Sequence, residues 1–211
     1  MVCARRDGLL SIFLRQCWGG SFQWNDTCLK SSCKCFEDIG EITMLYGQKE
    51  RFGIEIELND DPGGAWMFGK FCYWLNGEQV GSFCEGTSLR DVLFSMKYIV
   101  GDTGSRTAPS LAARDATETF RLISEALAER NGDIFTVISR DVLPACFDVC
   151  PNIDIFGSWN VYLIDALKNS KIIYSGDGGN TVKAAELMLG EFDTVASTVC
   201  EKLNGLLEVS R

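Results

Sequence analysis

Apolar residues alternate with glycine and glutamate over residues 52–58, FGIEIEL. This period of two is typical of a strand with one buried face. Residues 65–75 are apolar at almost every position, which is typical of a strand in the centre of a sheet or of one covered by a partner. The dipeptide Asn76-Gly77 favours a type I′ hairpin turn, because such a turn needs positive φ at both central residues. With residues 78–84 returning as a third strand, the pattern predicts an antiparallel meander.

Helical spacing begins directly after the predicted meander. Between residues 89 and 100, apolar side chains recur every three or four positions, behind a potential N-cap at Thr87 or Ser88. A second helix is predicted to begin at Asp115, with Glu118 three residues later as a capping-box partner. Both predicted helices are amphipathic, so each has one face to bury against a sheet.

The C-terminal part of the chain again mixes strands with a helix. Residues 159–164 and 171–175 predict another strand pair, and residues 182–189 fit either a strand or a helix. Residues 191–207 carry a long apolar stripe at helical spacing. These elements predict an α+β fold, with one antiparallel β-meander sheet and helices packed on one face of it.

Residues 1–43 differ from the rest of the chain. They hold five of the ten cysteines, show no sustained period, and carry equal numbers of acidic and basic residues. The net charge of −9 therefore belongs to residues 44–211, which have 24 acidic and 15 basic residues. We expect residues 1–43 to be an N-terminal extension, either disordered or upstream of a true start at Met44, and residues 44–211 to form a single domain.

The composition excludes several classes of protein. The chain has no histidine, which removes Ser-His-Asp and Cys-His mechanisms and most catalytic zinc sites. The cysteine spacings fit no common zinc pattern, and no apolar run approaches the roughly 20 residues of a membrane helix. A negative net charge opposes binding to nucleic acid. We expect a cytoplasmic protein with reduced thiols, no catalytic residues, no metal, no cofactor and no membrane contact.

Carboxylates are the one remaining source of chemistry. Glu55, Glu57, Asp60 and Asp61 could hold Mg²⁺ through oxygen ligands, which leaves a metal-dependent hydrolase as an alternative function. The competing interpretation is a solvated strand face that runs into an acidic turn. Residues 175–180, SGDGGN, could cradle a phosphate, but they lack the lysine and spacing of a P-loop and favour a turn.

Acidic and large aromatic side chains together suit a protein partner. Tryptophan is among the residues that dominate binding hot spots, and acids favour the electrostatic capture of a basic protein. The candidate partner-binding residues are Glu55, Glu57, Asp60, Asp61, Trp66, Trp74, Trp159 and Asp177. Core packing is the competing explanation for each tryptophan, and solubility is the competing explanation for the acids.

Several segments resemble one known family in the same order along the chain. They are MLYGQKERFGIEIEL (44–58), the turn Pro62-Gly63-Gly64, GKFCYWLNG (69–77), GTSLRDVLF (86–94), FGSWNVYLI (156–164) and the start of the last predicted helix at Gly190-Glu191-Phe192-Asp193. Residues 44 to about 207 resemble the bacterial immunity protein 42 family, which is found beside polymorphic and contact-dependent toxins. These are fold residues, so the resemblance assigns no active site.

The resemblance implies a small cytoplasmic protein that binds and neutralises a cognate toxin C-terminal domain by stoichiometric inhibition. The negative charge adds an expectation of our own, that the toxin is a basic nuclease. A general protein-interaction adaptor with no toxin remains a further alternative, beside the metal-dependent hydrolase. The sequence does not indicate an oligomeric state.

Overall fold

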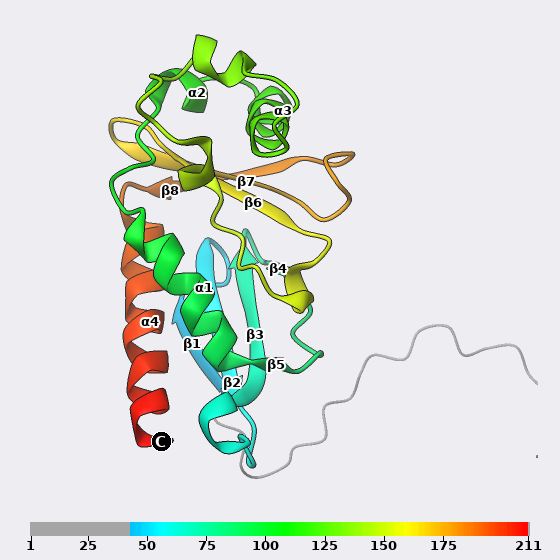
Figure 1. Cartoon of the computed structure of the whole chain (residues 1–211), viewed down its shortest axis with the longest axis vertical. Coiled ribbons are helices and arrows are strands. Elements are labelled where there is room, and N and C mark those ends of the chain that lie inside the picture. Colours follow the sequence, from blue (N-terminus) through cyan, green and yellow to red (C-terminus); the bar gives the residue numbers. More distant parts are fainter. Residues whose placement is uncertain (1–42, 211) are drawn as a thin grey trace, which may run out of the picture. The chain divides into compact units, whose positions relative to one another are not determined.

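The computed structural model describes residues 43–210, which contain two antiparallel sheets and four α-helices (Figure 1). The expectation for the N-terminal extension therefore lies outside the described residues, apart from Thr43. None of the described helices is long and apolar enough to cross a membrane. The first sheet contains β1 (Thr43–Gly47), β2 (Phe52–Leu58), β3 (Phe68–Leu75), β4 (Glu78–Val80) and β5 (Thr87–Ser88). The second contains β6 (Asn160–Asp165), β7 (Asn169–Ser175) and β8 (Lys183–Met188), and the helices are α1 (Leu89–Gly101), α2 (Pro109–Ala112), α3 (Ala116–Leu127) and α4 (Glu191–Val209).

The first sheet is the predicted meander, with strand order β1-β2-β3-β4 and the short β5 paired with β3. The hairpin between β3 and β4 turns at Asn76 and Gly77, whose φ angles of 51° and 78° confirm the predicted type I′ geometry. Alternate residues of β2 and β3 point to one face and are fully buried there. They are Phe52, Ile54, Ile56, Phe71, Tyr73 and Leu75.

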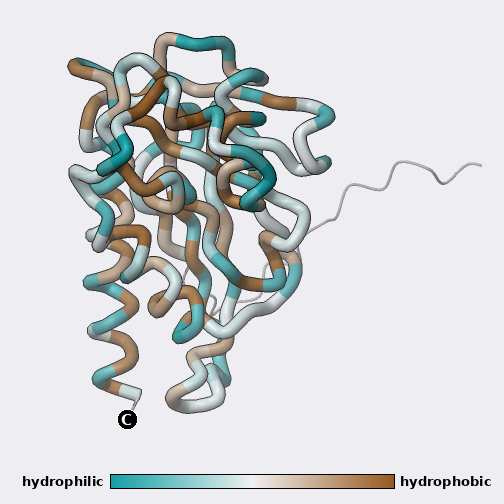
Figure 2. The backbone as a smooth tube through the Cα atoms, turned by 45° about the horizontal axis from the view of Figure 1, so that its top comes forward, coloured by the Kyte–Doolittle hydropathy of each residue, from teal (hydrophilic) through white to brown (hydrophobic). Residues whose placement is uncertain are grey.

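Helices α1 and α4 pack on this buried face (Figure 1). Ser88 caps α1, since its hydroxyl accepts a hydrogen bond from the Asp91 N–H at 3.3 Å. Hydrophobic and hydrophilic bands alternate along α4, the helix that ends at the label C in Figure 2. Its Phe192 ring stacks on Phe52 of β2 and meets Tyr73 of β3 edge-on, so α4 is fixed to both strands.

Strand β6 of the second sheet is buried on both faces. Val161 and Leu163 of β6 belong to the same core as α1 and α4. Tyr162 and Ile164, on the opposite face of β6, belong to a second core. This core is formed with α2, α3 and the segment between α3 and β6. This placement explains why residues 159–164 are apolar at nearly every position.

The structure confirms the α+β class but changes some details of the sheet. The strands form two sheets rather than one, and residues 182–189, which the sequence left open, contain strand β8. The predicted strand over residues 65–75 begins only at Phe68, because Gly63, Gly64 and Met67 take positive φ and form a 3₁₀ turn. The strand predicted to reach residue 84 ends at Val80.

One buried arginine joins parts of the chain that are far apart in sequence. Arg106, in the loop after α1, is fully buried, and its Nη1 donates to Asp193 Oδ1 of α4 at 2.8 Å. Its Nε donates to the carbonyl of Cys146 at 2.9 Å, and its Nη2 donates to the carbonyl of Ile99 at the end of α1. No sequence pattern predicts this ion pair, because its two members lie 87 positions apart.

Replacing Asp193 with alanine should lower the free energy of unfolding by about 3–5 kcal/mol, because it leaves the Arg106 guanidinium buried without its counter-charge. Urea unfolding of the full chain measures this effect. The matched control is Glu118→Ala, which removes an ion pair with Arg114 that is exposed on both sides and should cost less than about 1 kcal/mol. Equal losses in the two variants would contradict a special role for the buried pair.

Candidate functional site

Six of the eight candidate residues lie on one face of the first sheet or at its end. We call this face, which points away from the core of α1 and α4, the outer face. It is defined by the alternation along β1, β2 and β3, which places on it Thr43, Leu45, Glu55, Glu57, Phe68, Lys70, Cys72 and Trp74. Of the candidates, Glu55, Glu57 and Trp74 lie on this face, and Asp60, Asp61 and Trp66 lie in the connection between β2 and β3.

Glu55 is the centre of a polar cluster on the outer face. Its carboxylate accepts hydrogen bonds from Lys49 Nζ at 2.8 and 2.9 Å and from Trp74 Nε1 at 2.7 Å. The Lys49 ammonium also lies 4.3 Å from the centroid of the Trp74 ring, a favourable cation–π distance. One carboxylate thus orients both a lysine and a tryptophan.

Glu57 makes a second cluster one step along the same strand. It forms an ion pair with Lys70 of β3 and accepts a hydrogen bond from the Thr43 hydroxyl at 3.0 Å. Glu55 and Glu57 are both buried, with relative exposures of 9% and 5%, so the expectation of a solvated strand face was wrong. Burial is tolerated because each carboxylate has a cation and a hydrogen-bond donor. Within residues 43–210, no group of three or more acidic or cysteine side chains could hold a metal ion.

An exposed aromatic patch lies at the end of the outer face. The rings of Trp66 and Phe68 stack with centroids 6.4 Å apart, and both side chains are nearly half exposed. The Arg90 guanidinium lies 3.6 Å from the centroid of Trp66. Asp60 and Asp61 precede the patch, and Asp61 Oδ1 accepts from the Gly63 N–H at 3.2 Å. Trp66, Phe68 and Arg90, which we call the aromatic patch, are side chains of the kinds that dominate hot spots.

The other two candidates, Trp159 and Asp177, lie beside a shallow hollow at the second sheet. On its wall the Glu78 carboxylate accepts from Lys183 Nζ at 2.7 and 2.9 Å and from the Tyr174 hydroxyl at 3.2 Å. The structure does not bring Trp159 and Asp177 together with the outer face. The candidates thus divide between two places.

The loop that contains Asp177 is closed on itself. The Thr181 N–H donates to Asp177 Oδ1 at 2.8 Å, and the Ser175 hydroxyl donates to the same oxygen at 2.8 Å. These hydrogen bonds lower the pKa of Asp177 to about 2, with the backbone bond from Thr181 as the largest cause. The carboxylate accepts the Thr181 N–H, and the Ser175 hydroxyl oxygen accepts the N–H groups of Asp177 and Gly179. These N–H groups are therefore not free for a phosphate, which confirms the interpretation of residues 175–180 as a turn.

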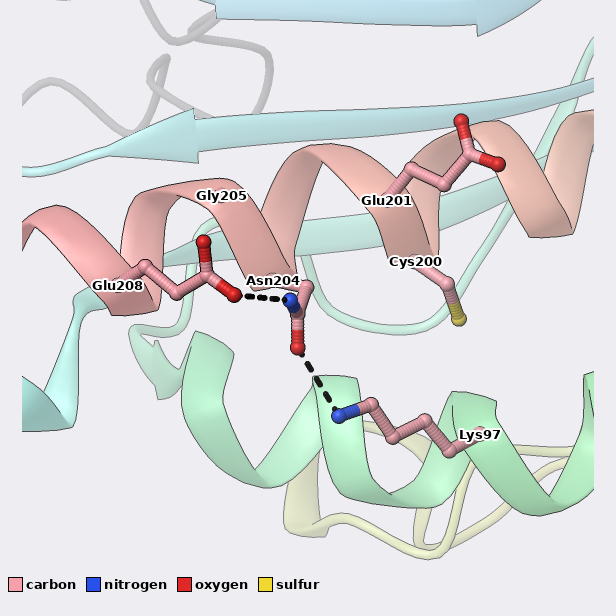
Figure 3. Close-up of a pocket in the computed structure, with 6 residues that line it drawn as sticks. All are labelled: Lys97, Cys200, Glu201, Asn204, Gly205 and Glu208. Carbon is pink, nitrogen blue, oxygen red and sulfur yellow. Dashed lines mark hydrogen bonds between the residues drawn. The ribbon is translucent and has the colours of Figure 1, made fainter.

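A groove between α1 and α4 is lined by Lys97, Cys200, Glu201, Asn204, Gly205 and Glu208 (Figure 3). Lys97 Nζ donates to Asn204 Oδ1 at 3.0 Å, and Asn204 Nδ2 donates to Glu208 Oε1 at 3.0 Å. Burial raises the pKa of the Cys200 thiol to about 11, so this sulfur is protonated at neutral pH and is a poor nucleophile. The polar groups here tie the two helices together.

The described cysteines are all free thiols, and most of them are buried. Burial raises the pKa of Cys72 on the outer face to about 12 and also raises that of Cys150. Cys84 is the exposed one, and no cation or histidine of the described residues pairs with it. The described thiols therefore give no support to nucleophilic catalysis.

Comparisons with known proteins found one family model and one solved structure that match this chain. A family model described as immunity protein 42 matches residues 44–201. No curated protein sequence matches the chain. Among solved structures, the crystal structure of CdiI from Burkholderia dolosa AUO158 has a TM-score of 0.53 and 18% sequence identity, and the match covers 75% of this chain and 99% of that chain. At this identity the likeness shows a shared fold.

Proposed function

The chain belongs to the immunity protein 42 family, and on that premise we propose that it neutralises one cognate toxin domain by holding it in a stoichiometric complex. The protein is a toxin immunity protein, a binder and not an enzyme. The family match over residues 44–201 is the observation that carries the proposal, since it spans both sheets and the first half of α4.

The structural relative suggests the kind of toxin. That protein is a CdiI, and this chain shares its fold. By extension, the partner here is the C-terminal domain of a contact-dependent or related polymorphic toxin, encoded beside this gene. The two proteins would meet in the cytoplasm.

The aromatic patch at the end of the outer face is the proposed contact region. Trp66 and Phe68 expose large apolar rings, which a partner can bury at little entropic cost because Arg90 already orders Trp66. Near the other end of β3, Glu55 fixes the indole of Trp74. The region is therefore ordered before binding and rich in side chains that contribute strongly to affinity.

The charge of the chain indicates the chemistry of the partner. Residues 44–211 hold 24 acidic and 15 basic residues, so the domain repels acidic proteins and attracts basic ones. A nuclease toxin is basic where it binds phosphates, and a carboxylate-rich surface suits such a site. This supports a basic nuclease as the toxin.

Co-expression of the full chain with the C-terminal domain encoded immediately upstream should restore growth, and the two proteins should co-purify. Binding removes the toxin's activity without any chemistry on the part of the immunity protein. Colony counts and gel filtration of the purified pair measure both effects. Persistent toxicity with no complex would contradict the proposed function.

Paired variants locate the contact region in the same assay. Trp66→Ala should weaken the complex about tenfold or more, as expected for a central aromatic anchor. The matched control is Tyr98→Ala on α1, which removes a more exposed ring, 81% against 49%, outside the patch and should leave affinity unchanged. A loss with Tyr98→Ala as large as that with Trp66→Ala would argue against the patch.

The association rate of the complex should fall as salt rises, because screening weakens the long-range attraction between opposite charges. Stopped-flow mixing at ionic strengths between about 0.01 and 0.15 M, where the Debye length shrinks from roughly 30 to 8 Å, measures the rate. The dissociation rate is the internal control and should change little. An association rate that is insensitive to salt would contradict electrostatic capture of the toxin.

A further inference from the structure

Among the described strands, β1 is an edge strand of the first sheet. Within residues 43–210 it pairs with β2 only, whereas β2 and β3 each have neighbours on both sides. The Asn59 N–H donates to the carbonyl of Phe68 at 3.1 Å, and the Asn76 N–H donates to the carbonyl of Arg51 at 3.0 Å. These bonds flank the β2–β3 ladder and fix which residues of β2 bond to β3 and which bond to β1.

The β2–β3 ladder also determines which backbone groups of β1 bond to β2. Odd-numbered residues of β2 bond to β3, so Ile54 and Ile56 bond to their partners on β1, Tyr46 and Met44. In an antiparallel pair the intervening residues direct their backbone groups away from the partner strand. The N–H and C=O groups of Thr43 and Leu45 therefore point to the open side. No hydrogen bond to these backbone groups is found from any residue that the structure describes.

The open edge of β1 is unguarded. Folded proteins protect edge strands with lysine, proline, bulges or very short length, because an open edge pairs with other chains. The sequence of β1, Thr-Met-Leu-Tyr-Gly, contains no charge and no proline, and the Leu45 side chain is 42% exposed. The other described edges differ, since β4 has three residues, β8 carries Lys183 and Glu186, and β6 is bridged by Thr107 and Asp148.

We propose that an extended segment of the toxin domain adds to β1 as a further antiparallel or parallel strand of the first sheet. The inference rests on the proposed function and specifies how the partner is held. Backbone hydrogen bonds to Thr43 and Leu45 would supply affinity, and side chains of the added strand would supply specificity. On the outer face, an apolar side chain of the toxin fits beside Leu45.

Charge selects the toxin over a second copy of this chain. Pairing two β1 edges would bring together two chains that each carry a net charge of −9. Such repulsion opposes self-association and favours a basic partner. The edge is thus suited to a segment of opposite charge.

Backbone amide exchange in the full chain tests strand addition directly. In the free protein the Leu45 amide should exchange quickly, and in the complex with the upstream-encoded toxin domain it should slow by about tenfold or more as its N–H becomes bonded. The Tyr46 amide, which bonds to β2, is the internal control and should be protected in both states. A complex in which Leu45 exchange is unchanged would overturn strand addition and leave the proposed function standing.

Amide exchange in the free chain tests whether the β1 edge is filled by the chain's own residues or by a second copy. A Leu45 amide already protected at every protein concentration would mean that the edge is filled by the chain's own residues, and protection that grows with concentration would mean a second copy. Either result overturns the proposal. The absence of any complex with the toxin domain would instead count against the proposed function itself.

A variant pair gives a second, independent test. Leu45→Pro removes an N–H that points away from β2, a position where edge strands tolerate proline, and should weaken toxin binding by about tenfold or more. Leu45→Val keeps the N–H and should bind as the parent chain does. Thermal unfolding checks that both variants are folded. A folded Leu45→Pro chain with undiminished affinity would contradict strand addition.

Discussion

The buried guanidinium of Arg106 ties together the parts on which the proposed binding region depends. Its donors reach the end of α1 at Ile99, the start of α4 at Asp193 and the segment between α3 and β6 at Cys146. Removing a charge from water is costly, and only this complete set of partners offsets the cost. The arrangement of α1, α4 and the second core is therefore fixed at one point.

That arrangement gives the first sheet a rigid support. Phe192 of α4 packs on Phe52 and Tyr73, and the Tyr73 hydroxyl donates to the Val149 carbonyl at 3.2 Å. The buried face of the sheet is thus filled, and the exposed aromatic patch and the β1 edge are the places proposed for a partner. A surface that is ordered before binding loses less entropy on association, which suits a protein whose function is to hold a toxin tightly.

The sequence predicted those parts of the fold that local chemistry determines. Alternation identified β2, the Asn-Gly turn identified the hairpin, and Asp115 caps α3 through its bonds to the Thr117 and Glu118 N–H groups. Strand β1 was missed because five uncharged residues show too little alternation. The division into two sheets was missed because it depends on which strands meet in space.

The candidate site was only partly predictable for the same reason. Glu55 and Glu57 were expected to be solvated, but Lys49 in the turn between β1 and β2 pairs with Glu55, and Lys70 on the neighbouring strand β3 pairs with Glu57. Phe68 and Arg90 joined the aromatic patch through stacking on Trp66, although they are separated from each other by 22 positions. Trp159 and Asp177 looked equivalent to the other candidates in sequence, and the fold places them at a different sheet.

Titration of the toxin's activity shows whether this protein acts by binding. Purified full-length protein is added stepwise to a fixed amount of the upstream-encoded toxin domain, well above the dissociation constant, and the remaining activity is measured. Stoichiometric binding should give a linear fall to zero at one molar equivalent. Loss of activity at far below one equivalent would indicate catalysis, and undiminished activity at excess would contradict neutralisation of that toxin.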